Sequence, residues 1–321
     1  MSKNLLEELV SAYKEKKIAK YAYIDKMQSF NKTLFYLSKR LKNTDMHKIE
    51  IQDDLLLFTT RKDRIKLAFT GLDRRGAPFD ILNFDYYEKE DEEVLFNLLK
   101  KNAVILDIGA NIGWYSLLFS KRLPQSKIYA FEPIQDTYKN LVTNINLNKS
   151  NNIFSFNLGL SEKKGFLPYY YFPEGSVLAS EKNLINCPKA KPITCQVDTL
   201  DTFVSTQRLD RLDLIKCDVE GAELSVIKGG LDAIKQFLPI LFVELFERWA
   251  LQFNYHPNDV IDLLKKIGYN CFLANKDRLD ICPVYKEIEE ERLNFFFLHS
   301  LKHRDLINTL PKKLSFANSL C

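Results

Sequence analysis

Short apolar segments alternate with segments of helical periodicity between residues 89 and 300, and this alternation limits the chain to few folds. Strands that alternate with helices form a mostly parallel sheet with helices on both faces, because each helix returns the chain to the same end of the sheet. We therefore predict an α/β fold, in which the segment at 293–299 inserts antiparallel because no helix precedes it. The expected strands are residues 103–108, 127–132, 152–158, 212–217, 240–245, 269–274 and 293–299.

Three regions lie outside this alternation and are expected to form separate parts of the chain. Residues 1–45 have helical periodicity, and residues 46–88 alternate between apolar and polar side chains as half-buried strands do. Residues 301–321 form a basic tail. The expected organisation is an N-terminal helical segment, a small β region or hairpin, a main domain over residues 89–300, and the tail.

The N-terminal helical segment carries an apolar stripe with the spacing of a coiled-coil seam, in alternating steps of four and three residues. The stripe spans fewer than three heptads, so we expect it to pack against its own domain. Self-association into a homo-oligomer through this stripe is the alternative. The stripe consists of Tyr23, Met27, Phe30, Leu34, Leu37 and Leu41.

A long insertion separates the third and fourth expected strands, at residues 159–200. It contains an aromatic run at 166–173 and a second strand-like run at 192–197. Two such runs predict an aromatic hairpin that lies over the carboxyl edge of the main sheet.

Composition and charge exclude several classes of protein. Hydrophobic residues make up 46% and charged residues 27% of the chain, which is typical of a globular protein and not of a disordered one. No segment approaches the roughly 18 apolar residues of a membrane span. The net charge is only +4 and no nucleic-acid motif accompanies the basic residues. The six cysteines show no C-x-x-C or zinc spacing. We expect a cytoplasmic protein with no nucleic-acid partner.

A turn with two glycines links the first strand of the main domain to the following helix. Asp107 lies near the end of the strand, and Gly109 and Gly113 lie in the turn. Ligands of open α/β sheets bind at this place, where strand ends and helix N-termini form a crevice. A dinucleotide fingerprint needs glycine at its first, third and sixth positions, but this chain has Gly109, Asn111 and Trp114 there. A nicotinamide-dependent oxidoreductase is therefore disfavoured, and we keep it as an alternative.

S-adenosylmethionine fits the turn better, because it carries an amine, a carboxylate, a sulfonium and a ribose but no phosphate. Acidic and backbone groups suit its cationic groups, and a carboxylate can accept hydrogen bonds from both ribose hydroxyls. Glu132 ends the second strand and has the position for that role, although nicotinamide-binding domains use the same device. The residues predicted to bind the methyl donor are Asp107, Gly109, Asn111, Gly113, Glu132 and Pro133.

Four motifs, in this order and spacing, resemble the FkbM family of S-adenosylmethionine-dependent methyltransferases. The similarity covers residues 85–300 and includes Thr199-Leu200-Asp201 and Tyr87-Glu88. Cys217 and Gly159 depart from the family pattern, where an aliphatic residue and an alanine are more usual. The four motifs are Asp107-Ile108-Gly109-Ala110-Asn111-Ile112-Gly113-Trp114-Tyr115-Ser116, Phe131-Glu132-Pro133, Lys216-Cys217-Asp218-Val219-Glu220-Gly221-Ala222-Glu223 and Val243-Glu244-Leu245.

The resemblance implies a Rossmann-like class I methyltransferase fold with a seven-stranded sheet and the methyl donor along the first two strand ends. It also implies O-methylation of a hydroxyl on a sugar, a glycan or glycolipid precursor, or a secondary metabolite. A non-catalytic scaffold that keeps this fold is a further alternative. In that case the apolar stripe of residues 23–41 would be its interaction face.

A hydroxyl is a poor nucleophile, so a base or a metal ion should assist its attack on the methyl carbon. Asp218 is the first candidate base and Glu220 the second, although Glu220 could instead stabilise the N-terminus of the next helix. His256 is the third candidate, although a histidine before a helix is more often a cap. A Mg²⁺ ion held by Asp218 and Glu244, which end neighbouring strands, is the alternative. We expect Glu223 to lie on the helix surface.

Aromatic residues after the fifth strand and in the insertion are candidates for the wall of an acceptor pocket, since pockets are rich in aromatic side chains. Each could equally be part of the core. Arg248 could bind an acidic acceptor or pair with a nearby surface acid. The aromatic candidates are Trp249, Phe253, Tyr255 and the run of residues 169–172.

Overall fold

The main domain is built on one eight-stranded sheet with the strand order β13-β12-β14-β11-β10-β4-β5-β6. The computed structural model describes residues 5–53, 55–69, 76–276, 278–285 and 293–309. Strands β6, β5, β4, β10 and β11 run parallel, whereas β14 pairs antiparallel with both β11 and β12. The strands are β4 (Val104–Ile108), β5 (Lys127–Phe131), β6 (Ile153–Phe156), β10 (Leu214–Cys217), β11 (Ile240–Glu244), β12 (Tyr269–Asn275), β13 (Arg278–Ile281) and β14 (Asn294–His299).

All seven expected strands are present, and the antiparallel insertion of the last one is confirmed. The eighth strand, β13, pairs with β12 at the sheet edge and had no separate signal in the sequence. The parallel strands and the reversed β14 together confirm the α/β class and the Rossmann-like arrangement. Strands β4, β5 and β6 form one side of the sheet and the later strands form the other, so the two halves meet between β4 and β10.

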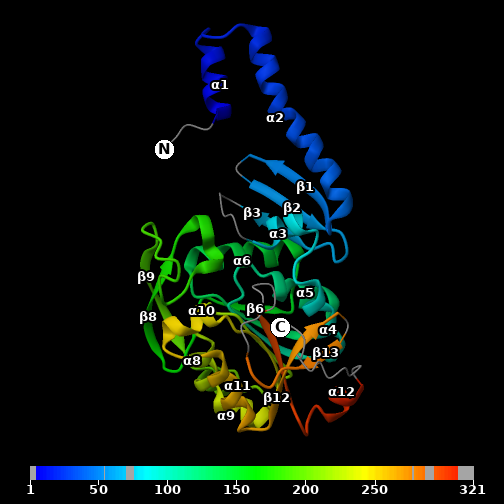
Figure 1. Cartoon of the computed structure of the whole chain (residues 1–321), viewed down its shortest axis with the longest axis vertical. Helices are drawn as coiled ribbons and strands as arrows, with labels where there is room; N and C mark the ends of the chain where they lie inside the picture. Colours follow the sequence, from blue (N-terminus) through cyan, green and yellow to red (C-terminus); the bar gives the residue numbers. More distant parts are fainter. Residues whose placement is uncertain (1–4, 54, 70–75, 277, 286–292, 310–321) are drawn as a thin grey trace, which may run out of the picture.

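Helices cover both faces of this sheet (Figure 1). One buried cluster includes Ile105 and Phe242 and packs under α4, α5 and α6. The other includes Leu106 and Val243 and packs under α7, α8, α9 and α11. Neighbouring strand residues enter opposite clusters because successive side chains of a strand point to opposite faces. The helices are α4 (Lys89–Leu98), α5 (Trp114–Arg122), α6 (Gln135–Asn148), α7 (Leu200–Thr206), α8 (Glu223–Lys228), α9 (Leu231–Phe237), α10 (Glu247–Ala250) and α11 (Pro257–Lys265).

The insertion forms a separate three-stranded sheet with the order β7-β9-β8. Strand β8 (Gly165–Tyr171) pairs antiparallel with β9 (Lys191–Asp198), which confirms the predicted hairpin. The short strand β7 (Gly159–Leu160) completes the sheet, and the 3₁₀ helix η2 (Pro173–Leu178) follows β8.

The predicted small β region is an antiparallel sheet of β1 (Met46–Gln52), β2 (Leu55–Thr60) and β3 (Lys66–Phe69), followed by α3 (Ala77–Phe84). Side chains of α6 bind its edge: the Ala68 N–H donates to the Asn144 side-chain oxygen over 2.8 Å. These bonds satisfy backbone groups of β3 that no strand covers, and they fix the small sheet to the main domain.

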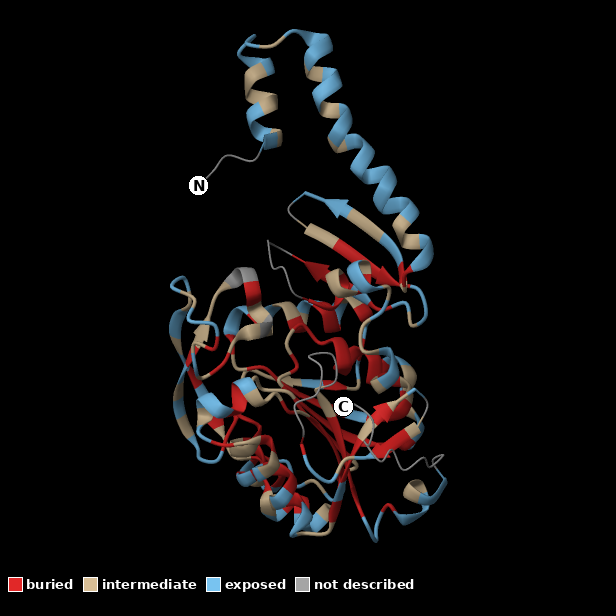
Figure 2. Ribbon diagram, viewed as in Figure 1, coloured by how far each residue is buried: buried red, intermediate tan, exposed pale blue. Residues whose placement is uncertain are grey.

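The N-terminal helices α1 (Leu5–Lys14) and α2 (Lys20–Arg40) project from the rest of the chain (Figure 1). They contact each other through the rings of Tyr13 and Tyr23, which stack with centroids 4.5 Å apart. No residue of α2 is buried (Figure 2). Leu34 in the apolar stripe is 52% exposed. Of the stripe, Leu41 packs against the core of the chain, as expected. The expected packing is wrong for the residues of α2, and self-association through the stripe stays a prediction.

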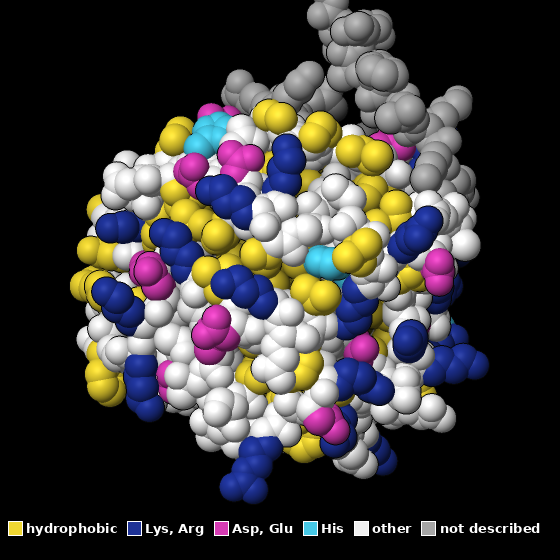
Figure 3. All heavy atoms as spheres, turned by 90° about the horizontal axis from the view of Figure 1, so that it is seen from below, with side chains coloured by type: hydrophobic (Ala, Val, Ile, Leu, Met, Phe, Trp, Pro, Cys, Tyr) yellow, Lys and Arg dark blue, Asp and Glu magenta, His cyan; other side chains and the backbone are white. Residues whose placement is uncertain are grey.

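The short helix α12 (Arg304–Thr309) begins the expected basic tail, and residues 310–321 of that tail lie outside the described part of the chain. Within the described residues, no helix combines the length and the apolarity that crossing a membrane would need. Figure 3 shows lysine and arginine side chains scattered over one face of the molecule and mixed with acidic ones.

Candidate active site

A cavity of about 240 Å³ lies at the carboxyl edge of the main sheet, next to the ends of β4, β5, β10 and β11. The sequence analysis placed one acidic residue at each of these ends. All four line the cavity, as do most of the predicted donor-binding residues. The predicted residues in its lining are Asp107, Gly109, Asn111, Glu132, Pro133, Asp218, Glu220 and Glu244.

The turn after β4 is built so that the ends of β4 and β10 touch. Gly109 has a φ of +78°, and a Cβ at this position would lie 1.8 Å from the carbonyl oxygen of Asp218. Only glycine allows this approach. Gly113 does not line the cavity: its φ is +95°, and a Cβ there would lie 2.6 Å from the Leu141 side chain of α6. Gly113 therefore supports the site by packing.

Glu132 holds the turn from the end of β5. Its carboxylate accepts the Asn111 N–H over 3.0 Å and the Ile134 N–H over 2.9 Å. Burial raises the pKa of Glu132 to about 7, against the opposing effect of these two N–H donors. Each carboxylate oxygen keeps a second lone pair, so the group can accept further hydrogen bonds from a ligand in the cavity.

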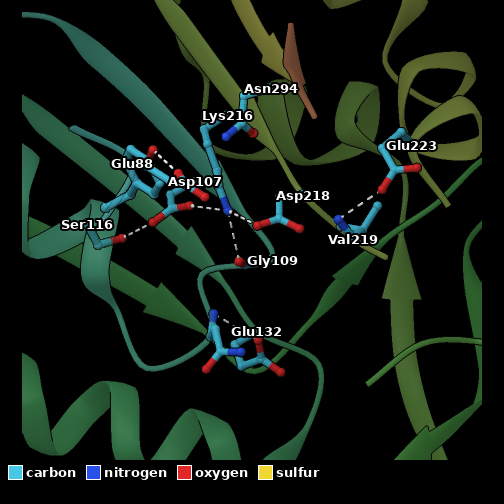
Figure 4. A network of polar contacts seen from close by, with 12 residues as sticks. Glu88, Asp107, Gly109, Ser116, Glu132, Lys216, Asp218, Val219, Glu223 and Asn294 are labelled. Carbon is cyan, nitrogen blue, oxygen red and sulfur yellow. Dashed lines mark hydrogen bonds and ion pairs between the residues drawn. The ribbon is translucent and has the colours of Figure 1, made fainter. Parts of the chain in front are cut away.

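A buried lysine joins the ends of β4 and β10 (Figure 4). The Lys216 Nζ donates to an Asp218 oxygen over 3.0 Å and to the Gly109 carbonyl over 3.2 Å, and it lies 3.7 Å from Asp107 Oδ1. The other Asp107 oxygen accepts the Ser116 hydroxyl over 2.6 Å. Burial raises the pKa of Asp107, and the nearby Lys216 limits that rise.

Lys216 itself is 6% exposed. Burial acts to lower its pKa, but attraction to Asp218 and Asp107 outweighs burial and raises the pKa above its ordinary value. The sequence analysis quoted this lysine without giving it a role. The available signal was a charged residue inside the apolar strand segment Leu214-Ile215-Lys216-Cys217, where a lysine needs a buried partner.

Three carboxylates face one another beside this lysine. Oxygens of Asp218, Glu220 and Glu244 lie within 4.8 Å of one another. Burial raises the pKa of Glu244 well above its ordinary value, and repulsion from Asp218 and Glu220 adds to that rise. The sequence analysis predicted Asp218 and Glu244 as the metal pair, and the structure adds Glu220. Such a group can share a proton, and its hard oxygen atoms also suit a divalent cation such as Mg²⁺.

Glu223, the first residue of α8, holds the turn that precedes this helix. One Glu223 oxygen accepts the N–H groups of Val219 and Gly221, and the other accepts the Tyr255 hydroxyl over 2.9 Å. Glu223 is 2% exposed, so its predicted surface position is wrong. Burial raises the pKa of Glu223 to about 7. Glu220 lines the cavity.

His256 is the N-cap of α11, and the structure places it away from the cavity lining. Its Nδ1 accepts the Asn258 N–H over 3.1 Å, and its Nε2 lies 3.3 Å from a Glu247 oxygen. Both ring nitrogens are thus engaged outside the cavity. This arrangement corrects the third candidate base, and it matches the capping alternative.

A second cavity, of about 750 Å³, shares Glu220 and Glu244 with the first. Aromatic rings from the insertion and from α10 line it, namely Phe172, Phe246 and Trp249. Two other candidates for its wall are absent from its lining: Phe253 packs beside Gly221, and Tyr255 is buried with its hydroxyl on Glu223. Tyr169 lines the first cavity.

Comparisons with known proteins agree with this arrangement. A sequence profile described as the methyltransferase FkbM domain matches residues 107–271, from the first acidic strand end into β12. The chain is 34% identical over 159 residues to methyltransferase sdnD of Sordaria araneosa, covering 41% of this chain and 61% of that protein.

Two further relatives match longer parts of their own length. Hexuronic acid methyltransferase AglP of Haloferax volcanii is 26% identical over 206 residues, covering 64% of this chain and 75% of that protein. The 2-O-methyltransferase NoeI of Sinorhizobium fredii is 26% identical over 189 residues, covering 55% of this chain and 76% of that protein. The match to sdnD thus spans about three fifths of that relative.

Proposed function

The chain belongs to the FkbM family of methyltransferases, and on this premise we propose that it transfers a methyl group from S-adenosylmethionine to a hydroxyl oxygen. The observation that carries the proposal is the meeting of two cavities at Glu220 and Glu244. One cavity has the donor-type turn and Glu132, and the other has aromatic walls. An acceptor in the second cavity would face a donor in the first across a row of carboxylates.

The residues present fit the donor. Glu132 has spare acceptor capacity for two ribose hydroxyls, and the turn at 109–113 allows close approach to the backbone. Asp107 supplies negative charge near a cationic ligand, and Lys216 keeps it in place. When bound, S-adenosylmethionine supplies an electrophilic methyl carbon.

Deprotonation of the acceptor hydroxyl is the task of the carboxylate group. Asp218 is fixed by Lys216, whereas Glu220 and Glu244 line both cavities. We assign the acceptance of the hydroxyl proton to this group, with Asp218 and Glu220 as the bases to be separated by experiment. A divalent cation on the same three oxygens would serve the same end by lowering the pKa of the hydroxyl.

The proposed acceptor is a sugar, a glycan or glycolipid precursor, or a secondary metabolite. The names of AglP and NoeI support a saccharide and an oxygen as the target, since one is a hexuronic acid methyltransferase and the other a 2-O-methyltransferase. The aromatic rings of the second cavity agree with a sugar, because sugar rings stack on aromatic faces.

Calorimetry tests the donor assignment. We expect S-adenosylhomocysteine to bind and NAD not to bind. Glu132→Gln should weaken binding about tenfold or more, because an amide cannot accept hydrogen bonds at both of its ends. Glu162→Gln, at an exposed position, is the matched control. Binding of NAD in place of S-adenosylhomocysteine would favour the oxidoreductase alternative, and binding of neither would favour the scaffold.

Transfer assays with tritiated donor and a panel of sugars then test the chemistry. Asp218→Asn and Glu220→Gln should leave S-adenosylhomocysteine affinity nearly unchanged, and the one that carries the base should slow transfer about 100-fold. Treatment with EDTA separates the two uses of the carboxylates. Loss of transfer that Mg²⁺ restores indicates a metal, whereas unchanged transfer indicates a protein base alone.

A further inference from the structure

Two basic side chains line the second cavity without lining the first. Arg248 comes from α10, and Lys189 comes from the insertion shortly before β9. The two acidic residues of the second cavity, Glu220 and Glu244, line the first cavity as well. The acids are therefore shared by the two cavities, whereas the basic side chains belong to the second cavity alone.

From this separation, and resting on the proposed function, we propose that the second cavity selects an acceptor that carries an acidic group besides its reactive hydroxyl. The hydroxyl would face Glu220 and Glu244, and the acidic group would lie against Arg248 and Lys189. A carboxylate and a phosphate share the chemistry that a guanidinium recognises, which is a planar pair of N–H donors against two oxygens.

Arg248 is available for this role. Among the described residues it makes no ion pair and no hydrogen bond, although acids lie on the neighbouring elements. Its guanidinium lies over the Trp249 ring, 5.2 Å from the centroid. This contact holds an exposed side chain at the cavity without using its N–H donors. The alternative from the sequence, that Arg248 pairs with a nearby surface acid, is therefore not seen.

Aromatic walls of the second cavity would favour a contact between Arg248 and an acidic group of the acceptor. The rings of Phe246 and Trp249 pack edge to face with centroids 5.1 Å apart, and Phe172 also lines the cavity. Rigid aromatic walls orient a ring-shaped ligand at low entropic cost and exclude water, which strengthens an arginine–anion contact.

The test compares three small probes with the enzyme saturated with S-adenosylhomocysteine. They are methyl glucuronide, which carries a carboxylate, glucose 6-phosphate, which carries a phosphate, and neutral methyl glucoside. We expect one of the two acidic probes to bind at least about tenfold more tightly than the neutral one, as measured by saturation-transfer NMR. Which acidic probe binds better distinguishes a carboxylate acceptor from a phosphate acceptor.

Arg248→Gln should remove this preference, and Arg248→Lys should keep only part of it, because lysine provides a point charge and no planar pair of donors. Arg304→Gln makes the same change of net charge at an exposed position of α12 and should change nothing. Equal binding of neutral and acidic probes, no binding of any probe, or a preference that survives Arg248→Gln would each overturn the proposal. Saturation by S-adenosylhomocysteine is measured in the same samples, so failure of donor binding is recognised separately.

Discussion

Replacement of Lys216 by methionine tests whether one buried cation holds the ends of β4 and β10 together. The variant keeps the length of the side chain but leaves Asp107, which is fully buried, and Asp218 without their cation. It also removes the hydrogen bond to the Gly109 carbonyl. We expect lower stability and weaker donor binding, because the turn at Gly109 would no longer be fixed against Asp218.

The distances give the size of the effect. With an effective dielectric constant of about 20, Coulomb's law gives roughly 5 kcal/mol for the 3.0 Å contact to Asp218 and roughly 4 kcal/mol for the 3.7 Å contact to Asp107. Desolvation of the ammonium group offsets part of this, and the Asp218 side chain is 33% exposed, which weakens its share. The free energy of unfolding should therefore fall by about 3–5 kcal/mol.

The loss should depend on pH in a direction that follows from linkage. Burial already raises the pKa of Asp107, and removal of Lys216 removes the interaction that limits the rise. The folded variant then takes up a proton more readily than the unfolded chain, so its stability rises relative to the wild type as the pH falls. Urea unfolding at about pH 8 and about pH 5 should show the larger loss at the higher pH.

Two variants serve as controls for this experiment. Lys228→Met removes an exposed lysine from α8 and should change stability by less than about 0.5 kcal/mol. Adding Asp107→Asn to Lys216→Met should recover part of the lost stability, because the uncompensated charge is removed. A loss below about 1 kcal/mol in Lys216→Met, or a loss that does not change with pH, would refute the reasoning.

Three further predictions follow from single contacts. Gly109→Ala should abolish binding of S-adenosylhomocysteine in calorimetry and lower the melting temperature, because the new Cβ would meet the Asp218 carbonyl. In the control Gly165→Ala the new Cβ meets no atom within 4 Å, so this variant should be neutral. Affinity for S-adenosylhomocysteine should rise between about pH 6 and pH 8 as Glu132, whose pKa burial raises to about 7, ionises, and Glu132→Gln should make that profile flat. His256→Ala should cost about 1 kcal/mol of stability through loss of the cap on α11, with methyl transfer unchanged.

The fold was largely predictable because its signals are local. Each parallel strand is a continuous apolar segment between turn residues, and each helix has its own apolar face. The position of α2 was not predictable in the same way. A stripe at heptad spacing shows that a helix has an apolar side, but it does not show what that side contacts, and here it contacts little within the described chain.

The site was predictable only where its residues end a strand. Asp107, Glu132, Asp218 and Glu244 each follow or close an apolar run, and parallel strands bring such ends to one edge. The role of Lys216 depends on the β4–β10 pairing, which joins residues about a hundred positions apart. The two basic side chains of the second cavity come from α10 and from the insertion, and no spacing in the sequence connects them.

The positions of Glu220 and Glu223 show what sequence spacing leaves undetermined. Glu223 is buried and holds the turn before α8, whereas Glu220 lines the cavity. Both lie near the start of α8, so either could satisfy its first N–H groups. The backbone decides between them, because Glu220 has a φ of +52° and Gly221 a φ of +99°. A left-handed conformation at a glutamate is strained, and it persists only where neighbouring contacts hold it. Here the buried Ser180 hydroxyl of the insertion donates to the Glu220 carbonyl over 2.7 Å, and Glu223 accepts two backbone N–H groups of the same turn. The insertion is therefore part of the candidate active site in a structural sense, since it helps to hold the turn of Glu220, which lines both cavities.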